Sequence, residues 1–130
     1  MHYVYIAIFG ALGAAARYGI SITFETGIFP YNTLFINVIG CFLLAIVVTY
    51  LSTFSKLSHA LITGLGTGLI GSFTTFSAFS IQACDLLLGG HYFIASAYIL
   101  SSLIGGFLSA AVGVYVSNKL IAGREIEGND

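Results

Sequence analysis

Four long stretches of this sequence contain no charged side chain, and they constrain the fold more than any other feature. They are Met1–Ala16, Thr26–Ser55, Leu57–Cys84 and Leu86–Asn118. A membrane-spanning helix needs about 20 apolar residues, so three runs are long enough, and the first is adequate once it extends to about Tyr18. Only 7% of the residues are charged, against about a quarter in an average globular chain. The sequence therefore predicts an all-α membrane protein with four transmembrane helices.

The expected helices follow these runs and are joined by short loops. We expect helices over about 3–18, 32–53, 57–88 and 92–119, and a polar tail over 123–130. The third helix is too long for one ordinary span, and Gly71 would permit a break in it. Residues 1–130 thus form a single transmembrane domain with no room for a soluble catalytic domain. One chain is small for a pathway of its own, so we expect an oligomer.

The few charged residues exclude several functions. A net charge of −1 argues against a nucleic-acid partner, because phosphate binding needs clustered Lys and Arg. No acidic residue lies well inside a span, where proton-driven carriers place a carboxylate. No catalytic triad, carboxylate pair or Cys–His set falls within one membrane layer, so we expect no enzyme. Lys and Arg in short loops set the orientation of a membrane protein. If both termini lie on one side, that side holds Lys56, Lys119 and Arg124, and the other side holds only Arg17. This small excess favours termini inside the cell and is weak enough to allow insertion in both orientations.

Glycines precede the middle of the third helix. Residues 66–71 match the G-x-G-x-x-G dinucleotide fingerprint, which needs a preceding strand and a following helix. No strand precedes them, so we interpret Gly64 and Gly68 as a small-x-x-x-small pair that lets two helices approach closely. The fourth helix carries similar stripes of small residues, and simple packing explains them as well as function does. They are Ser102, Gly106 and Ala110, and Gly105, Ser109 and Gly113.

The segment 71–80, GSFTTFSAFS, places five hydroxyl groups and three phenylalanines at membrane depth. One interpretation is that the rings are core side chains. The other is that ring edges, which are electropositive, and hydroxyl hydrogens line a path for a small anion. A break at Gly71 would also expose backbone carbonyls as cation ligands, at a cost of several kcal/mol if nothing binds them. Asn37 in the second helix is equally consistent with interhelical packing and with a ligand-facing donor.

Three motifs together resemble the Fluc/CrcB family of fluoride channels over essentially the whole chain. They are Gly10-x-x-Gly13-Ala14-x-x-Arg17-Tyr18, the Asn37 of Thr33-Leu-Phe-Ile-Asn-Val-Ile-Gly40, and Gly68-x-x-Gly71-x-x-Thr74-Thr75-Phe76-Ser77-x-Phe79-Ser80. The resemblance implies an antiparallel, dual-topology homodimer in the inner membrane of a microbe. It also implies a third helix broken near 71–75 and passive fluoride export through two pores per dimer. The alternatives are a proton-coupled small-solute transporter, disfavoured by the missing carboxylate, and a non-transporting assembly subunit.

The resemblance also assigns roles to individual residues. Phe76 and Phe79 would line the pore, Asn37 would donate to fluoride, and Arg17 would lie at the vestibule or anchor its helix. The carbonyls of Gly71 and Thr74 from both subunits would hold a structural sodium ion. The remaining pore-lining candidates are Thr75, Ser77, Tyr98, Ser102 and Ser109. In the fourth helix, Ser101 competes with Ser102 and Ser109 for this role.

Overall fold

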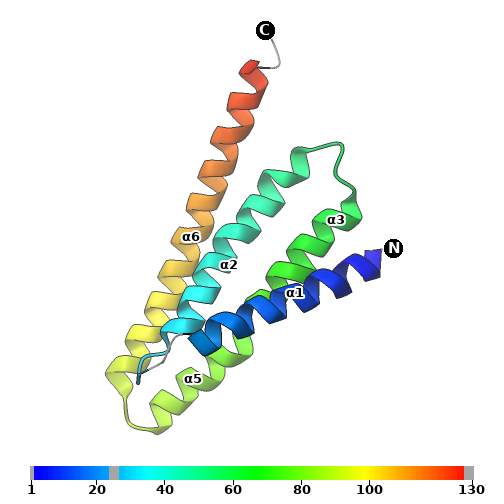
Figure 1. The fold of residues 1–130 in the computed structure, drawn as a ribbon. Helices are drawn as coiled ribbons and strands as arrows, with labels where there is room; N and C mark the ends of the chain where they lie inside the picture. Colours follow the sequence, from blue (N-terminus) through cyan, green and yellow to red (C-terminus); the bar gives the residue numbers. More distant parts are fainter. Residues whose placement is uncertain (1, 24–26, 128–130) are drawn as a thin grey trace.

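The computed structural model describes residues 2–23 and 27–127, apart from the side chains of 2 and 125–127. All regular secondary structure in the described residues is helical, with no strand (Figure 1). Glu25 of the expected first loop lies outside these residues. The elements are the α-helices α1 (His2–Thr23), α2 (Tyr31–Thr49), α3 (His59–Thr63), α4 (Gly71–Phe73), α5 (Phe76–Leu88) and α6 (Tyr92–Glu127), the 3₁₀ turn η1 (Leu51–Thr53) and the π-helix η2 (Gly64–Ile70).

Within the described residues, four helical segments are long and apolar enough to cross a membrane. They are Tyr3–Thr23, Tyr31–Thr53, His59–Leu88 and Tyr92–Arg124. Their side chains are largely exposed on the single chain, as suits a protein whose solvent is lipid. The prediction of an all-α membrane protein with four spans is confirmed.

Helices α2 and α6 run side by side in the same direction and form one half of the molecule (Figure 1). Small residues of α6 allow the close approach. A Cβ atom at Gly113 would lie 2.9 Å from the Phe42 carbonyl oxygen. The Ser109 hydroxyl donates to the Val38 carbonyl oxygen at 2.7 Å. The stripe of Gly105, Ser109 and Gly113 therefore packs against α2.

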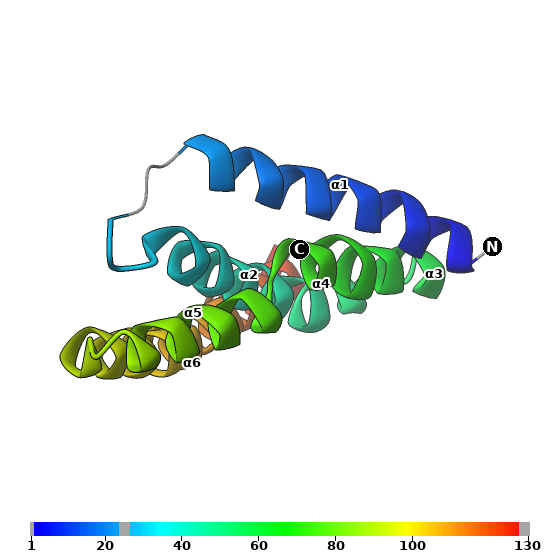
Figure 2. The same cartoon turned by 90° about the horizontal axis from the view of Figure 1, so that it is seen from below.

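Helix α1 packs on η2 and α4 and lies over one face of the other helices (Figure 2). Glycines make this contact as well. A Cβ atom at Gly68 would lie 2.8 Å from the Ile6 carbonyl oxygen, and one at Gly64 would lie 2.9 Å from the Phe9 ring. A Cβ atom at Gly13 would overlap the Leu69 carbonyl. The interpretation of these glycines as sites of close helix approach is confirmed.

Several helix ends differ from the sequence expectation. Helix α1 continues to Thr23, past the expected end near Tyr18, and the hydroxyls of Ser21 and Thr23 bond back to carbonyls one turn earlier, at 2.8 and 2.6 Å. The third span begins at His59, where Ser58 caps the helix by accepting from the Leu61 N–H. Helix α6 continues through 123–127 of the expected polar tail, and 128–130 lie outside the described residues.

Candidate functional site

The backbone of the third span leaves helical geometry at two threonines. Helix α4 ends at Phe73, Thr74 (φ −74°, ψ 159°) and Thr75 (φ −150°, ψ 114°) are extended, and α5 begins at Phe76. Both threonine side chains bond locally. The Thr74 hydroxyl donates to the Ile70 carbonyl at 2.9 Å, and the Thr75 hydroxyl accepts from the Ala78 N–H at 3.2 Å. Thr75 is therefore the N-cap of α5.

Asn37 of α2 supplies the hydrogen bonds that the extended backbone lacks. Its Oδ1 accepts from the Thr75 N–H at 2.8 Å, and its Nδ2 donates to the Thr75 carbonyl at 3.0 Å. Non-helical backbone at membrane depth needs such partners, because lipid offers none. An amide nitrogen carries two hydrogens, so one N–H of Asn37 remains for another acceptor. The two interpretations of Asn37, packing and donation, are compatible.

Gly40 lies one turn beyond Asn37 on α2 and makes room for this contact. A Cβ atom there would overlap the Thr74 methyl group. Any larger residue at 40 would force either the Thr74 side chain or α2 to move. The sequence signal for Gly40 was its spacing, three residues after the asparagine.

The same hydrogen bonds leave two carbonyls without their usual donors. In a continuous helix, the Gly71 and Thr74 carbonyls would accept from the N–H groups four residues later, those of Thr75 and Ala78. The Thr75 N–H donates to Asn37 instead, and the Ala78 N–H donates to the Thr75 hydroxyl. These are the two carbonyls that the family resemblance names as sodium ligands. Carbonyl oxygens of unwound helices suit that cation, so the residues fit the ion.

A largely apolar cavity with several hydroxyl and amide side chains in its wall opens beside the extended threonines. Its volume is ≈ 310 Å³, and no charged residue is among those that line it: Asn37, Gly40, Cys41, Leu44, Thr74, Thr75, Phe76, Phe79, Ser102 and Leu103. The centroids of the Phe76 and Phe79 rings are 5.8 Å apart at an interplanar angle of 38°. Phe76 is 80% exposed in the single chain, so its ring has one uncovered side.

Ser102 contributes a hydroxyl to this cavity from α6. The Ser102 Oγ atom is buried and has no hydrogen-bond partner among the described atoms. A buried polar atom without a partner costs about 1–3 kcal/mol. Such a hydroxyl is either a cost of packing or a donor kept for a ligand, and its place in the lining favours the second.

Tyr98 forms the wall behind Phe79. It is fully buried, its ring centroid lies 5.3 Å from that of Phe79, and its hydroxyl donates to Gln82 Oε1 at 2.9 Å. Sequence reasoning missed Gln82. Its signal was an amide inside an apolar run, three residues after Phe79, which repeats the spacing from Phe76 to Phe79.

Other predicted site residues lie away from the cavity lining. The Ser109 hydroxyl is bonded to α2, as described above, and Ser101 donates to the Tyr98 carbonyl at 3.1 Å. Ser77 is exposed in the first turn of α5, with its Oγ 3.3 Å from the Thr75 hydroxyl. Arg17 is half-buried in α1 and is not among the residues that line the cavity.

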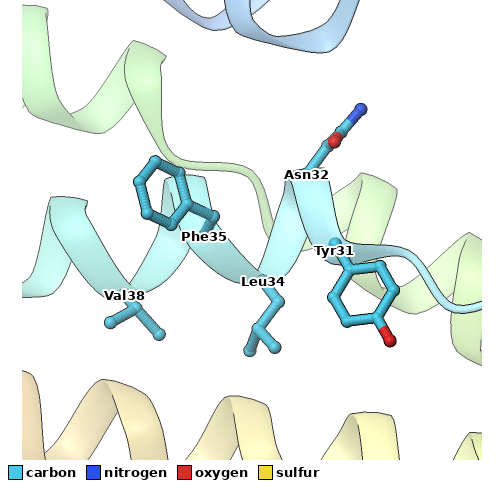
Figure 3. A pocket seen from close by; sticks show the side chains of 5 residues that line it. All are labelled: Tyr31, Asn32, Leu34, Phe35 and Val38. Carbon is cyan, nitrogen blue, oxygen red and sulfur yellow. The ribbon is translucent and has the colours of Figure 1, made fainter. Parts of the chain in front are cut away.

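A second, larger cavity of ≈ 500 Å³ lies on α2 and has a different character. It is lined by Tyr31, Asn32, Leu34, Phe35 and Val38. In Figure 3 the side chains of Leu34 and Val38 point to one side of the helix, and that of Asn32 points to the other. The exposed lining is almost entirely apolar, so this cavity suits hydrocarbon contact better than a hydrated ion.

The fold and the uncharged cavity together define a small multi-pass membrane protein with a site inside its helical bundle, a class that includes channels and small transporters. The sequence profile of the family described as "CrcB-like protein, Camphor Resistance (CrcB)" matches residues 4–114. The chain belongs to this family. Its relatives include a protein of Listeria innocua named "Fluoride-specific ion channel FluC 2", which is 48% identical over 93% of this chain and 94% of its own.

A second relative, "Fluoride-specific ion channel FluC 1" of Bacillus cereus, is 41% identical over 98% of this chain and 95% of its own. These matches confirm the resemblance inferred from the three sequence motifs. They also bear out the predicted class, because both relatives carry the name of an ion channel and neither that of an enzyme.

Proposed function

We propose that this chain is a fluoride-specific channel of the bacterial plasma membrane. The observation that carries the proposal is the uncharged cavity at the extended threonines, which brings together Asn37, Thr75, Phe76, Phe79 and Ser102. The names of the relatives supply the ion. Fluoride is small and strongly hydrated, so it needs many donors to replace its water.

The cavity offers those donors without a fixed charge. Asn37 retains one N–H, Ser102 an unpaired hydroxyl, and the phenylalanine rings present electropositive edges. A basic side chain would bind the anion tightly, and conduction requires binding weak enough for the ion to leave. No Asp, Glu, His, Lys or Arg side chain of the described residues lines the cavity, so it holds no ready proton carrier, and fluoride would move passively, without coupling to protons.

A single chain does not enclose this pathway, and we propose that two chains complete it as an antiparallel homodimer with two pores. The uncovered ring of Phe76 supports this, since a second subunit would bury it. The third span would be broken in mid-membrane at Thr74 and Thr75. The Gly71 and Thr74 carbonyls of both chains would then hold a sodium ion, which when bound supplies positive charge to the freed carbonyls and links the subunits.

The remaining predicted residues would act around this centre. Ser77 and Thr75 would pass the anion along their adjacent hydroxyls, and Tyr98 would hold Phe79 in place through their ring contact. Arg17 would raise the local anion concentration at the vestibule. Ser109 would act in the pathway only if its bond to Val38 is exchanged for one to fluoride.

An efflux assay tests the channel function. Liposomes containing the protein and loaded with potassium fluoride should release fluoride when valinomycin supplies a potassium path, and potassium chloride liposomes should retain chloride. The absence of fluoride release would contradict the proposal, and a requirement for a proton gradient would favour the transporter alternative.

The subunit interface needs a separate measurement. Replacing sodium by potassium should shift the equilibrium from dimer towards monomer in detergent. An unchanged equilibrium would contradict the proposed sodium site.

Phe76→Ile tests the role of a single aromatic ring in fluoride conduction. Because Phe76 is exposed in the single chain, its loss should leave the fold of each subunit intact while fluoride flux falls at least about tenfold, a barrier increase of about 1.4 kcal/mol. Leu88→Ala, which truncates an apolar side chain of α5 that is also exposed, is the matched control with wild-type flux. Normal flux in Phe76→Ile would contradict the role of the ring edge.

A further inference from the structure

The end of the molecule opposite the α5–α6 turn carries a cavity that fluoride conduction does not use. It has a volume of ≈ 400 Å³ and is lined by Tyr50, Val116, Lys119, Leu120, Gly123 and Arg124. The whole sequence has only four Lys and Arg residues, and two of them line this cavity. We propose that it binds the phosphate headgroup of an anionic phospholipid.

The cavity lies where the headgroups of a bilayer would be. Helix α2 has 19 residues and is about 28 Å long at 1.5 Å per residue, close to the roughly 30 Å of the hydrocarbon core. Tyr50 follows its last residue, at the level where tyrosines concentrate in membrane proteins. Helix α6 extends beyond this end of α2 (Figure 1), so Lys119 and Arg124 reach the polar layer.

Aromatic contacts hold Arg124 in an orientation that suits a phosphate. Its guanidinium carbon lies 4.0 Å from the centroid of the Phe54 ring. The Phe54 ring packs edge-on against Tyr50, with centroids 5.1 Å apart. Stacking uses the flat face of the guanidinium group and leaves the N–H groups at its edge, which match phosphate oxygens in pairs. No described side chain forms an ion pair with Arg124 or Lys119.

The apolar part of the lining distinguishes a lipid from a free anion. Val116 precedes both cations along α6, and Leu120 lies between Lys119 and Arg124, so apolar side chains lie beside the two charges in the same cavity. A lipid would contact these side chains and the Tyr50 ring while its phosphate meets Lys119 and Arg124. Inorganic phosphate would use only the cations, and phosphatidylcholine would bring a positive group against them.

Native mass spectrometry of the delipidated full-length protein in detergent tests the site. Dioleoylphosphatidylglycerol should bind at least tenfold more tightly than dioleoylphosphatidylcholine, and inorganic phosphate should show no retained adduct. The double variant K119Q/R124Q should weaken phosphatidylglycerol binding roughly 10- to 30-fold, since each cation near an anionic surface contributes about a factor of five. Lys119→Arg, which keeps both charges and leaves the stacked Arg124 in place, should bind within about threefold of wild type.

Lys56→Gln is the matched control, because it removes one charge near the same end of the molecule, two residues after Phe54, without touching the cavity. It should leave phosphatidylglycerol binding within about twofold. Circular dichroism and fluoride efflux of K119Q/R124Q should match wild type, which separates loss of the site from loss of the fold. Equal binding of the two lipids, or equal weakening by Lys56→Gln and the double variant, would overturn the proposal, and retained inorganic phosphate would replace the lipid by a free anion.

Discussion

Two regions of this molecule meet the same problem, a backbone in lipid, in opposite ways. Along the contact of α2 and α6 both helices are continuous, and each backbone satisfies its own hydrogen bonds. Small residues there, such as Gly105 and Gly113, only bring the two helices together. At Thr74 and Thr75 the backbone is extended, and side chains take over its hydrogen bonds: Asn37 bonds the Thr75 N–H and carbonyl, and the Thr75 hydroxyl accepts from the Ala78 N–H.

The difference shows where chemistry can occur in a chain with so few charges. In the α2–α6 contact, polar side chains bond to the neighbouring helix, as the bond from Ser109 to the Val38 carbonyl shows. At the extended threonines some polar groups lack a partner among the described residues. They are one N–H of Asn37 and the Ser102 hydroxyl, and the Gly71 and Thr74 carbonyls lack their usual helical donors. Those leftover groups, and not the most polar stretch of sequence as such, make the candidate site.

The largest effect in this comparison is expected for Asn37→Ala. It removes both bonds to the Thr75 backbone, so the free energy of unfolding should fall by about 2–4 kcal/mol. Fluoride efflux per folded protein should fall more than about tenfold, because the pathway loses a donor. SDS titration followed by circular dichroism measures the first quantity, and the liposome assay measures the second.

Asn32→Ala is the control for this variant, since Asn32 lies on the same helix and bonds the Ser21 carbonyl at 3.3 Å, at the exposed end. It should cost less than about 1 kcal/mol and leave efflux unchanged. If Asn37→Ala behaves like Asn32→Ala, the extended segment is held by other contacts and the contrast between the two regions fails.

A smaller effect, on stability alone, is expected for Gly113→Val in the α2–α6 contact. Its Cβ atom would lie 2.7 Å from that of Ala45 and 2.9 Å from the Phe42 carbonyl oxygen, and such overpacking costs about 1–3 kcal/mol. Efflux per folded protein should remain close to wild type. Gly19→Val adds the same side chain where nothing lies within 4 Å, and the two variants should differ in SDS titration by at least about 1 kcal/mol. Equal stabilities of the two variants would mean that α2 and α6 can move apart at little cost.

The smallest effect on stability, with the opposite sign, is expected for Ser102→Ala. Removing a buried hydroxyl without a partner should leave the free energy of unfolding unchanged or raise it by about 1 kcal/mol, while fluoride efflux falls several-fold. Ser101→Ala, which deletes a hydroxyl already bonded to the Tyr98 carbonyl, should keep wild-type efflux. A loss of stability with normal efflux in Ser102→Ala would make Ser102 a packing residue.

Some of this protein could be predicted from the sequence because it depends on local or additive properties. The four spans follow from the charge-free runs, because an unpaired charge is unfavourable in lipid however the helices pack against one another. The close approach at Gly64 and Gly68 follows from their spacing on one helix. The family follows from three motifs whose order and spacing fit a known pattern.

Only the tertiary structure decided which polar atoms are used and which are left over. The amide of Asn37 reaches Thr75, 38 residues away, and the same contact removes the donor from the Gly71 carbonyl. Ser102 and Ser109 are alike in the sequence, yet one hydroxyl is unpaired and the other is bonded to Val38. Hydrogen-bond partners across helices depend on the register and distance of the packed backbones, and a one-dimensional pattern does not contain those distances.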